Sequence, residues 1–443
     1  MFYIMPNMRI GMIAVVVTAF SWPCRTASAT HPAQGERSPR IERLRQEAAR
    51  RGPSAVQDFW SAVGRTGTPL IEAVPRDTET VLATFVYRGM ASTTGVTLSA
   101  QLRAGGAPGE NALERLGATN VWFRSYRIRK DLRFSYGFVE QSRSSGSATG
   151  VARDPLNPHV LSNGEGLLGP SVVVLPAAAP QPWTEPREGV ARGTMHSLRV
   201  HSVVLGQDRE AQIYTPAGYD ERRTTPYHLL LCFDGGWFAS ATSLPTILDN
   251  LIAARAIPPL VGIFVEQSPQ PQRNLELGND DRFLSFLTTE LLPTVRRRWN
   301  ATADPHATAA CGGSSGGLAS LFAAYRRPDV IGNVISESGA FWVGHRQGDG
   351  KWEWLTHQIA GSAALPIHVV LDVGILESGA TDGGGPSILA TNRHLRDVLT
   401  TKGTDLDYRE VAGGHEPLSW RGGIADGLIS LFGSGSIRRA TRW

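Results

Sequence analysis

The stretch "ATAACGGSSGGLASLFAAY", residues 307–325, constrains the fold of this chain more than any other. A short apolar run opens it, and the apolar residues from Leu318 to Tyr325 recur at helical spacing. Between the two lies Gly312-Gly313-Ser314-Ser315-Gly316, a G-x-S-x-G pattern. In a turn from strand to helix, this pattern presents the central serine at a tight corner, where the glycines remove side chains that would collide. Ser314 is therefore the candidate nucleophile.

Two other interpretations of these glycines fit less well. A flexible linker would not be flanked by a strand and an amphipathic helix. A phosphate-binding loop of the Walker type requires Gly-Lys-Ser or Gly-Lys-Thr at its end, and this stretch contains no lysine. A catalytic turn remains the interpretation that its context favours.

A serine hydroxyl needs a base within hydrogen-bond reach and an acid that orients the base, in the chain order Ser, Asp or Glu, His. His415 follows a predicted strand in the glycine-rich loop "AGGHE" and is the candidate base. Glu377 lies just beyond the apolar run "HVVLDVGIL" and is the candidate acid. Asp382, five residues further along, remains the alternative acid.

The pattern also predicts where negative charge on a substrate carbonyl would be stabilised. Such an oxyanion hole uses two backbone N–H donors. We expect one from Ser315 and the other from Gly236, in the loop "DGGW" after the apolar run "LLLCF". The sequence has no H-E-x-x-H motif and no Cys/His pair at zinc spacing, so we expect neither a metal site nor a cofactor.

The pattern of apolar runs divides the chain into domains. In residues 196–443, runs that are apolar on both faces alternate with helical segments, which predicts an α/β domain with a mostly parallel sheet covered on both sides. Residues 75–174 contain short alternating runs rich in β-branched and aromatic residues, which predict a smaller antiparallel β-sandwich. A helical segment is expected over residues 30–74, and a proline-rich linker over residues 175–195.

Residues 1–29 resemble an export signal, because Arg9 precedes an apolar run and Ala27-Ser28-Ala29 supplies a cleavage site. The sequence thus predicts a periplasmic or secreted protein without a membrane anchor, since Trp22 and Pro23 before Cys24 do not suit a lipoprotein. Loss of two arginines would lower the formal net charge from +4 to +2, which argues against nucleic acid as a partner. The remaining cysteines, Cys232 and Cys311, are expected to be buried apolar residues rather than a redox pair.

Longer segments carry a family resemblance. "GGSSGGLASLFAAYRRPDVIGNVISESGAFW", "LLLCFDGGWF" and "GGHEPLSWRGGIADGLISLF" resemble α/β-hydrolases of the esterase D type, and specifically the enterochelin (ferric enterobactin) esterases. "FWSAVGRTGTPLIE" and "NVWFRSYRI" are similar to the N-terminal domain of that family, so the resemblance extends over residues 55–435. It implies the same nucleophile, base, acid and oxyanion donors as the residues themselves do.

The resemblance also implies a substrate. Family members cleave the ester bonds of a catecholate siderophore, a cyclic triester of 2,3-dihydroxybenzoylserine, and so aid the release of iron. A ferric tris-catecholate is anionic and aromatic, so cationic and aromatic side chains suit it. The candidate contacts are Trp237, Arg273, Trp342, Arg124 and Arg127, with Arg129, Arg133, Trp352 and Trp354 as further candidates.

Two other functions stay open at this point. One is an exported carboxylesterase for feruloyl or acetyl groups of polysaccharides, which an aromatic cleft without cationic partners would favour. The other is a siderophore-binding protein whose hydrolase domain is inactive, against which the presence of all three candidate catalytic residues argues.

Overall fold

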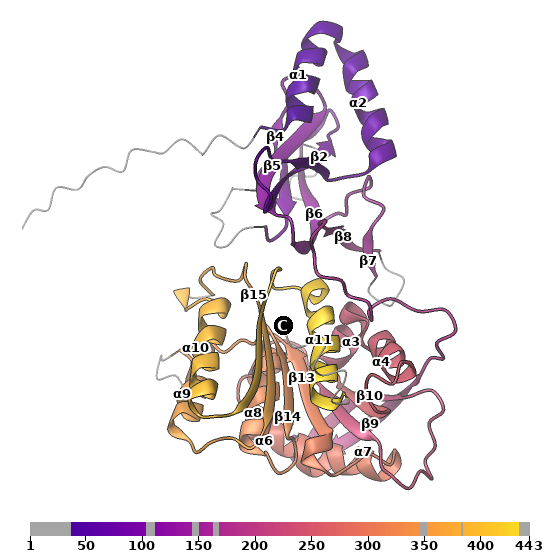
Figure 1. The fold of residues 1–443 in the computed structure, drawn as a ribbon, viewed down its shortest axis with the longest axis vertical. Helices are drawn as coiled ribbons and strands as arrows, with labels where there is room; N and C mark the ends of the chain where they lie inside the picture. The colour runs from indigo at the N-terminus through magenta and orange to yellow at the C-terminus, as the bar shows by residue number, and fades with distance from the viewer. Residues whose placement is uncertain are drawn as a thin grey trace, which may run out of the picture. The chain divides into compact units, whose positions relative to one another are not determined.

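The computed structural model describes residues 37–102, 111–143, 150–162, 168–344, 352–381 and 384–433 (Figure 1). The export signal predicted at residues 1–29 and the alternative acid Asp382 lie outside these ranges. Among the helices of the described part, none has the length and apolar character needed to span a membrane.

An eight-stranded sheet forms the centre of the C-terminal domain. Its strand order is β16-β15-β14-β13-β11-β12-β10-β9, and the six strands from β16 to β12 run parallel, while β10 and β9 are antiparallel to their neighbours. This confirms the predicted α/β class. The strands are β9 (Thr194–Ser202), β10 (Gln207–Thr215), β11 (His228–Cys232), β12 (Leu260–Val265), β13 (Thr308–Gly313), β14 (Asn333–Glu337), β15 (His368–Gly374) and β16 (Asp405–Val411).

Helices cover both faces of this sheet, and the strand residues divide between two apolar cores accordingly. In β11, Leu229 and Leu231 face the core built with α6 to α10, whereas Leu230 and Cys232 face the core built with α3, α4 and α11. This double burial explains why the strands are apolar along their whole length. The helices are α3 (Gly235–Thr242), α4 (Leu244–Ala253), α5 (Gln272–Leu277), α6 (Asp281–Ser285), η1 (Phe286–Leu291), α7 (Leu292–Arg298), η2 (Pro305–Ala307), α8 (Ser315–Arg326), α9 (Trp354–Gly361), α10 (Ile388–Thr401) and α11 (Pro417–Phe432).

Cys232 and Cys311 are register partners on the adjacent strands β11 and β13. Both are free and buried, with their Sγ atoms 2.9 Å apart. Burial raises the pKa of the Cys232 thiol well above its usual value, so this thiol is neutral at physiological pH.

The N-terminal domain contains two antiparallel sheets of four strands, in the orders β1-β2-β5-β4 and β3-β6-β8-β7. Their facing side chains share one aromatic-rich core that includes Phe85, Tyr126, Phe134 and Tyr136. This confirms the predicted antiparallel β-sheet domain before the α/β domain. The strands are β1 (Leu70–Ala73), β2 (Thr80–Arg88), β3 (Thr93–Ser99), β4 (Glu114–Arg115), β5 (Val121–Arg129), β6 (Arg133–Ser142), β7 (Val160–Ser162) and β8 (Leu168–Val174).

Two helices, α1 (Pro39–Arg51) and α2 (Pro53–Thr66), precede these strands. Their apolar faces, including Ile41 and Trp60, form a second small core with Val86 and Phe123 of the sheet. Neither a helix nor a strand is present between the end of β8 and the start of β9, the region where the sequence predicts a linker.

Candidate active site

Ser314 lies at the corner between β13 and α8, with φ of 56° and ψ of −120°. Few residues other than glycine adopt this backbone conformation, and its strain is typical of a catalytic turn. The corner is fixed by backbone hydrogen bonds: the Ser314 amide donates to the Glu337 carbonyl at 2.9 Å, and the Ser314 carbonyl accepts from the Ala340 amide at 2.9 Å. The neighbouring strand β14 and the loop after it therefore hold the serine.

The glycines of the turn are sterically required. A Cβ atom added at Gly312 would lie 2.6 Å from the Gly316 carbonyl carbon, closer than real Cβ contacts. The first turn of α8 passes this close to the end of β13 because Gly312 has no side chain, while a Cβ atom added at Gly316 would lie 3.3 Å from the Phe233 Cβ atom. The G-x-S-x-G pattern thus reflects packing between strand and helix.

His415 and Glu377 come from the loops after β16 and β15, and a distance of 2.6 Å joins His415 Nδ1 to Glu377 Oε2. The Glu377 side chain is buried, whereas His415 is half-buried. A carboxylate on Nδ1 fixes the tautomer that carries the proton there and leaves Nε2 as an acceptor. This arrangement is suited to a histidine that takes a proton from a hydroxyl.

The other oxygen of the Glu377 carboxylate is held from two sides. Its Oε1 accepts from the Gly374 amide at 2.9 Å and from the Ser338 hydroxyl at 2.5 Å. The Ser338 hydroxyl in turn accepts from Trp420 Nε1 at 3.0 Å. The Trp420 ring also meets the His415 ring edge to face, with centroids 5.1 Å apart.

Sequence reasoning missed Ser338 and Trp420. Ser338 follows a buried strand in "ISESG", with a positive φ of 50° that the sequence does not reveal. Trp420 stands five residues after His415, a spacing that by itself indicates no contact. Only the packing of α11 against the sheet brings the tryptophan to the acid and the base.

The predicted oxyanion loop begins at Asp234, which has a positive φ of 53° and precedes α3. The Phe238 amide makes the first helical bond, to the Asp234 carbonyl, so the amides of residues 235–237 have no partner within the helix. The Glu266 carboxylate lies beside Gly236, where an added Cβ atom would be 2.8 Å from either carboxylate oxygen, and burial raises the pKa of Glu266. Arg273 Nε donates to Asp234 Oδ1 at 2.6 Å and fixes the same loop.

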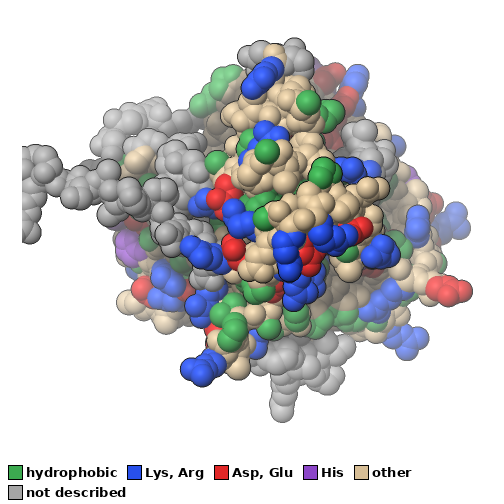
Figure 2. Space-filling model, turned by 90° about the horizontal axis from the view of Figure 1, so that it is seen from above, with side chains coloured by type: hydrophobic (Ala, Val, Ile, Leu, Met, Phe, Trp, Pro, Cys, Tyr) green, Lys and Arg blue, Asp and Glu red, His purple; other side chains and the backbone are tan. Residues whose placement is uncertain are grey.

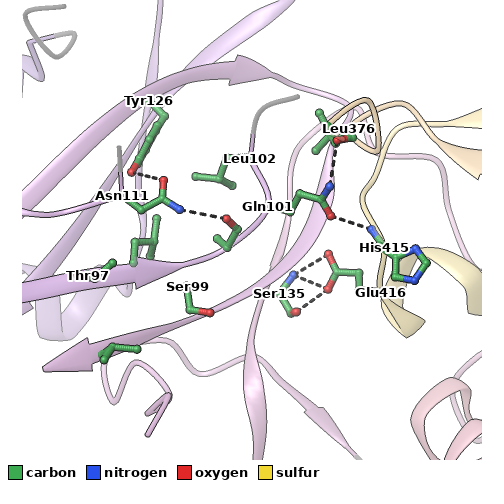
Figure 3. A pocket seen from close by; sticks show the side chains of 14 residues that line it. Thr97, Ser99, Gln101, Leu102, Asn111, Tyr126, Ser135, Leu376, His415 and Glu416 are labelled. Carbon is green, nitrogen blue, oxygen red and sulfur yellow. Dashed lines mark hydrogen bonds between the residues drawn. The ribbon is translucent and has the colours of Figure 1, made fainter. Parts of the chain in front are cut away.

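A cavity of about 720 Å³ adjoins His415 and is lined by both domains (Figure 3). None of the described lining residues is a lysine or arginine. Most of the polar groups are hydroxyls and amides. The lining residues are Thr97, Leu98, Ser99, Ala100, Gln101, Leu102, Asn111, Tyr126, Ser135, Val139, Leu376, Gly379, His415 and Glu416.

Glu416 is the only carboxylate in this described lining. It accepts hydrogen bonds from the Ser135 amide at 2.9 Å and the Ser135 hydroxyl at 2.5 Å, across the contact between the domains. Burial raises the pKa of Glu416 to about 7, and the two hydrogen bonds from Ser135 lower it only in part.

Comparison with known proteins agrees with this two-domain arrangement. Residues 82–184 match the family described as enterochelin esterase, N-terminal, and residues 202–431 match the putative esterase family. An iron(III) enterobactin esterase of Dickeya dadantii is 30% identical over 434 residues, covering 87% of this chain and 94% of the relative. This chain belongs to the enterochelin esterase family.

Solved structures of this family have the same fold. The ferric enterobactin esterase of Salmonella typhimurium is 26% identical, with a TM-score of 0.70, and the match covers 84% of this chain and 98% of that one. The enterobactin esterase of Shigella flexneri, crystallised in the presence of enterobactin, is 25% identical, with a TM-score of 0.66 and coverage of 83% and 96%.

For this enterochelin esterase family member, the tryptophans predicted to contact substrate lie in different surroundings. Trp237 is 47% exposed, and its ring centroid lies 6.3 Å from that of Trp420, next to the candidate base. Trp342 is half-buried and pairs with Trp352, with centroids 5.8 Å apart. Trp354 packs against Phe322 and the apolar core.

The structure does not bring the predicted arginines to the cavity. Arg127 pairs with Asp77, and Arg129 pairs with Asp131. Arg133 Nη2 donates to the Ala179 carbonyl at 2.8 Å, and Arg124 is half-buried on β5. Seen from above, Lys and Arg side chains are interspersed with Asp and Glu instead of forming a patch of one sign (Figure 2).

Proposed function

We propose that this chain hydrolyses the ester bonds of a ferric catecholate siderophore of the enterobactin type, with Ser314, His415 and Glu377 as its catalytic residues. The observation that carries the proposal is the 2.6 Å contact between His415 Nδ1 and Glu377 Oε2. The strained Ser314 turn is linked to this pair through Trp420, whose ring lies against Gly313 and meets the His415 ring. This arrangement occurs in a chain that matches iron(III) enterobactin esterases over both of its domains.

The proposed reaction has two stages. The Ser314 hydroxyl attacks the ester carbonyl while His415 Nε2 accepts its proton. The tetrahedral intermediate collapses with cleavage of the C–O bond, and His415 returns the proton to the departing serine hydroxyl of the siderophore. Water, activated by His415, then hydrolyses the acyl-enzyme, and Glu377 stabilises the imidazolium in both stages. The ferric ion is part of the substrate and takes no part in the bond changes.

Helices α3 and α8 begin at the site, and the backbone amides of their first turns are the proposed oxyanion donors. The Ser315 amide opens α8, directly after the candidate nucleophile, and stays the proposed first donor. Gly236 is the predicted second donor, and the Glu266 carboxylate lies close to it, since a Cβ atom added at Gly236 would lie 2.8 Å from either carboxylate oxygen. The Trp237 amide belongs to the same first turn of α3 and supplies an alternative donor.

The cavity favours a second candidate. A ferric tris-catecholate is strongly anionic, whereas the described lining contains no lysine or arginine and does contain Glu416. A carboxylate disfavours a nearby anion, and hydroxyls and amides suit an uncharged, hydroxyl-rich group. The second candidate is therefore a carboxylesterase for feruloyl or acetyl groups of polysaccharides. Under either function, we propose that residues 1–29 direct the protein to the periplasm or outside the cell.

The deciding experiment is mass spectrometry of products after the purified protein, without residues 1–29, is incubated with ferric enterobactin. Linear trimer, dimer and monomer of dihydroxybenzoylserine, absent with Ser314→Ala, are the expected result. Intact siderophore together with release of ferulate from a feruloylated oligosaccharide would establish the second candidate. Absence of both reactions and of labelling by a fluorophosphonate would identify a binding protein.

A further inference from the structure

Gln101 of the N-terminal domain joins the two loops that carry the candidate acid and base. It lies just after β3, and its Nε2 donates to the Leu376 carbonyl at 2.9 Å. Its Oε1 accepts from the His415 amide, also at 2.9 Å. Leu376 immediately precedes Glu377, so one side chain from the first domain spans both catalytic loops of the second (Figure 3).

The chemistry of this bridge is specific to a primary amide. One end must donate to a carbonyl and the other must accept from an N–H, and a glutamine side chain does both. A carboxylate of the same length would accept from His415 but not donate to Leu376. An apolar side chain of similar size would do neither.

The surroundings hold the bridge in place. A Cβ atom added at Gly414 would lie 2.4 Å from Gln101 Oε1, so the glycine before His415 is what allows the glutamine to approach the loop. Leu376 is 7% exposed and belongs to the aromatic core of the N-terminal domain, against which Ile375 and Ala412 also pack. The hydrogen bonds of Gln101 therefore lie beside apolar contacts from the same two loops.

We propose that Gln101 is a positioning residue, which sets the distance between Glu377 and His415 so that the N-terminal domain completes the catalytic site. This inference rests on the proposed roles of Glu377 and His415. It explains why the two loops hold their geometry although neither lies within a helix or a strand. The bond to the His415 backbone fixes the start of the side chain, and the bond to Leu376 fixes the position of the carboxylate beside it.

The test compares Gln101→Leu and Gln101→Glu with Gln141→Leu, a matched change at an exposed position on β6 of the same domain. The substrate is p-nitrophenyl acetate, which is too small to depend on the cavity. We expect Gln101→Leu to lower kcat by about 10- to 100-fold with KM changed less than threefold, because a small displacement of catalytic groups has effects of this size. Gln101→Glu keeps one of the two hydrogen bonds, so its kcat should lie between those of wild type and Gln101→Leu. The kcat of Gln141→Leu should equal that of wild type.

A second measurement separates positioning from a merely structural role. The downfield proton resonance of the His415 Nδ1–H group should broaden or disappear in Gln101→Leu and remain in Gln141→Leu. Wild-type kcat in Gln101→Leu, with only a lower melting temperature, would overturn the inference while leaving the proposed function intact. Unchanged esterase activity in Ser314→Ala would instead overturn the proposed function itself.

Discussion

The two ends of the candidate site are held in different ways. At the serine end, backbone groups do the positioning: the Ser314 amide and carbonyl bond to Glu337 and Ala340, and adjacent glycines let strand and helix meet. At the acid and base end, side chains contribute as well, namely those of Ser338, Trp420 and Gln101. The two backbone partners of Ser314 therefore lie within 26 positions along the chain, whereas the other end depends on residues up to 314 positions apart.

The largest effect should follow from removing the charge on the acid. Glu377→Gln keeps the shape but can present an N–H group toward His415 Nδ1, which favours the wrong tautomer. We expect kcat for an aryl ester to fall by about 10⁴-fold, as in other serine hydrolases changed in this way.

Glu353→Gln is the matched control, because Glu353 Oε2 lies 2.7 Å from His394 Nδ1 in an equivalent pair away from the described cavity. The kcat of Glu353→Gln for the same aryl ester should stay within twofold of wild type. If Glu377→Gln instead retains more than a tenth of kcat, the acid would be Asp382, and Asp382→Asn should then show the loss.

A change at the serine end tests whether backbone packing alone sets its geometry. Gly312→Ala would place a Cβ atom 2.6 Å from the Gly316 carbonyl carbon, so β13 and α8 must separate. We expect kcat to fall by about 10²-fold, the size associated with a displacement near 1 Å. Steady-state kinetics with an aryl ester, beside thermal unfolding, measure the effect.

Gly64→Ala provides the comparison, since an added Cβ there meets no atom within 4 Å and the residue lies inside α2. It should leave kcat unchanged and stabilise the fold by up to about 1 kcal/mol, because alanine favours helix over glycine. An unchanged kcat in Gly312→Ala would mean that β13 and α8 can separate to admit the added methyl group without displacing Ser314.

The difference between the two ends also explains what the sequence predicts. The Ser314 turn is recognisable because strand, glycines, serine and helix are consecutive, and the α/β class follows from strands that are apolar on both faces. Gln101 and Ser338 carry no such local signal, since a lone glutamine after a strand is ordinarily a surface residue. The arginines of β5 are predicted as substrate contacts because the siderophore that the resemblance implies is anionic, and partners such as Asp77 cannot be identified without the pairing of the strands.

A smaller effect should follow from removing one of the hydrogen bonds on Glu377. Ser338→Ala deletes the hydroxyl that donates to Oε1 and leaves Trp420 Nε1 without its acceptor, while the Gly374 amide still holds the carboxylate. We expect kcat to fall about tenfold, at the lower end of the range for hydrogen bonds to charged groups. Ser362→Ala, whose hydroxyl bonds only backbone carbonyls in the described structure at the end of α9, should have no effect on kcat. A similar loss in both variants would indicate general destabilisation.

The smallest effect concerns stability and its dependence on pH. Burial raises the pKa of Glu416 from its usual value of 4.5 to about 7, so between these values the folded protein holds a proton that the unfolded chain has released. The folded state then binds more protons, and the free energy of unfolding falls as pH rises through this window. Glu416→Gln mimics the protonated form and can still accept from the Ser135 amide.

We therefore expect Glu416→Gln to be more stable than wild type at pH 8 by about 1 to 2 kcal/mol, a value reduced from the full shift because the side chain is partly exposed. The gain should disappear at pH 4, as measured by urea unfolding, and Glu114→Gln on the exposed strand β4 should show no such trend. A loss of stability at pH 8 would mean that Ser135 binds an ionised carboxylate strongly enough to offset burial. In that case Glu416 would carry a negative charge next to His415, and Ser135 of the N-terminal domain would hold it there. Because the serine end relies on backbone groups that do not titrate, its geometry should stay the same across this pH range under either outcome.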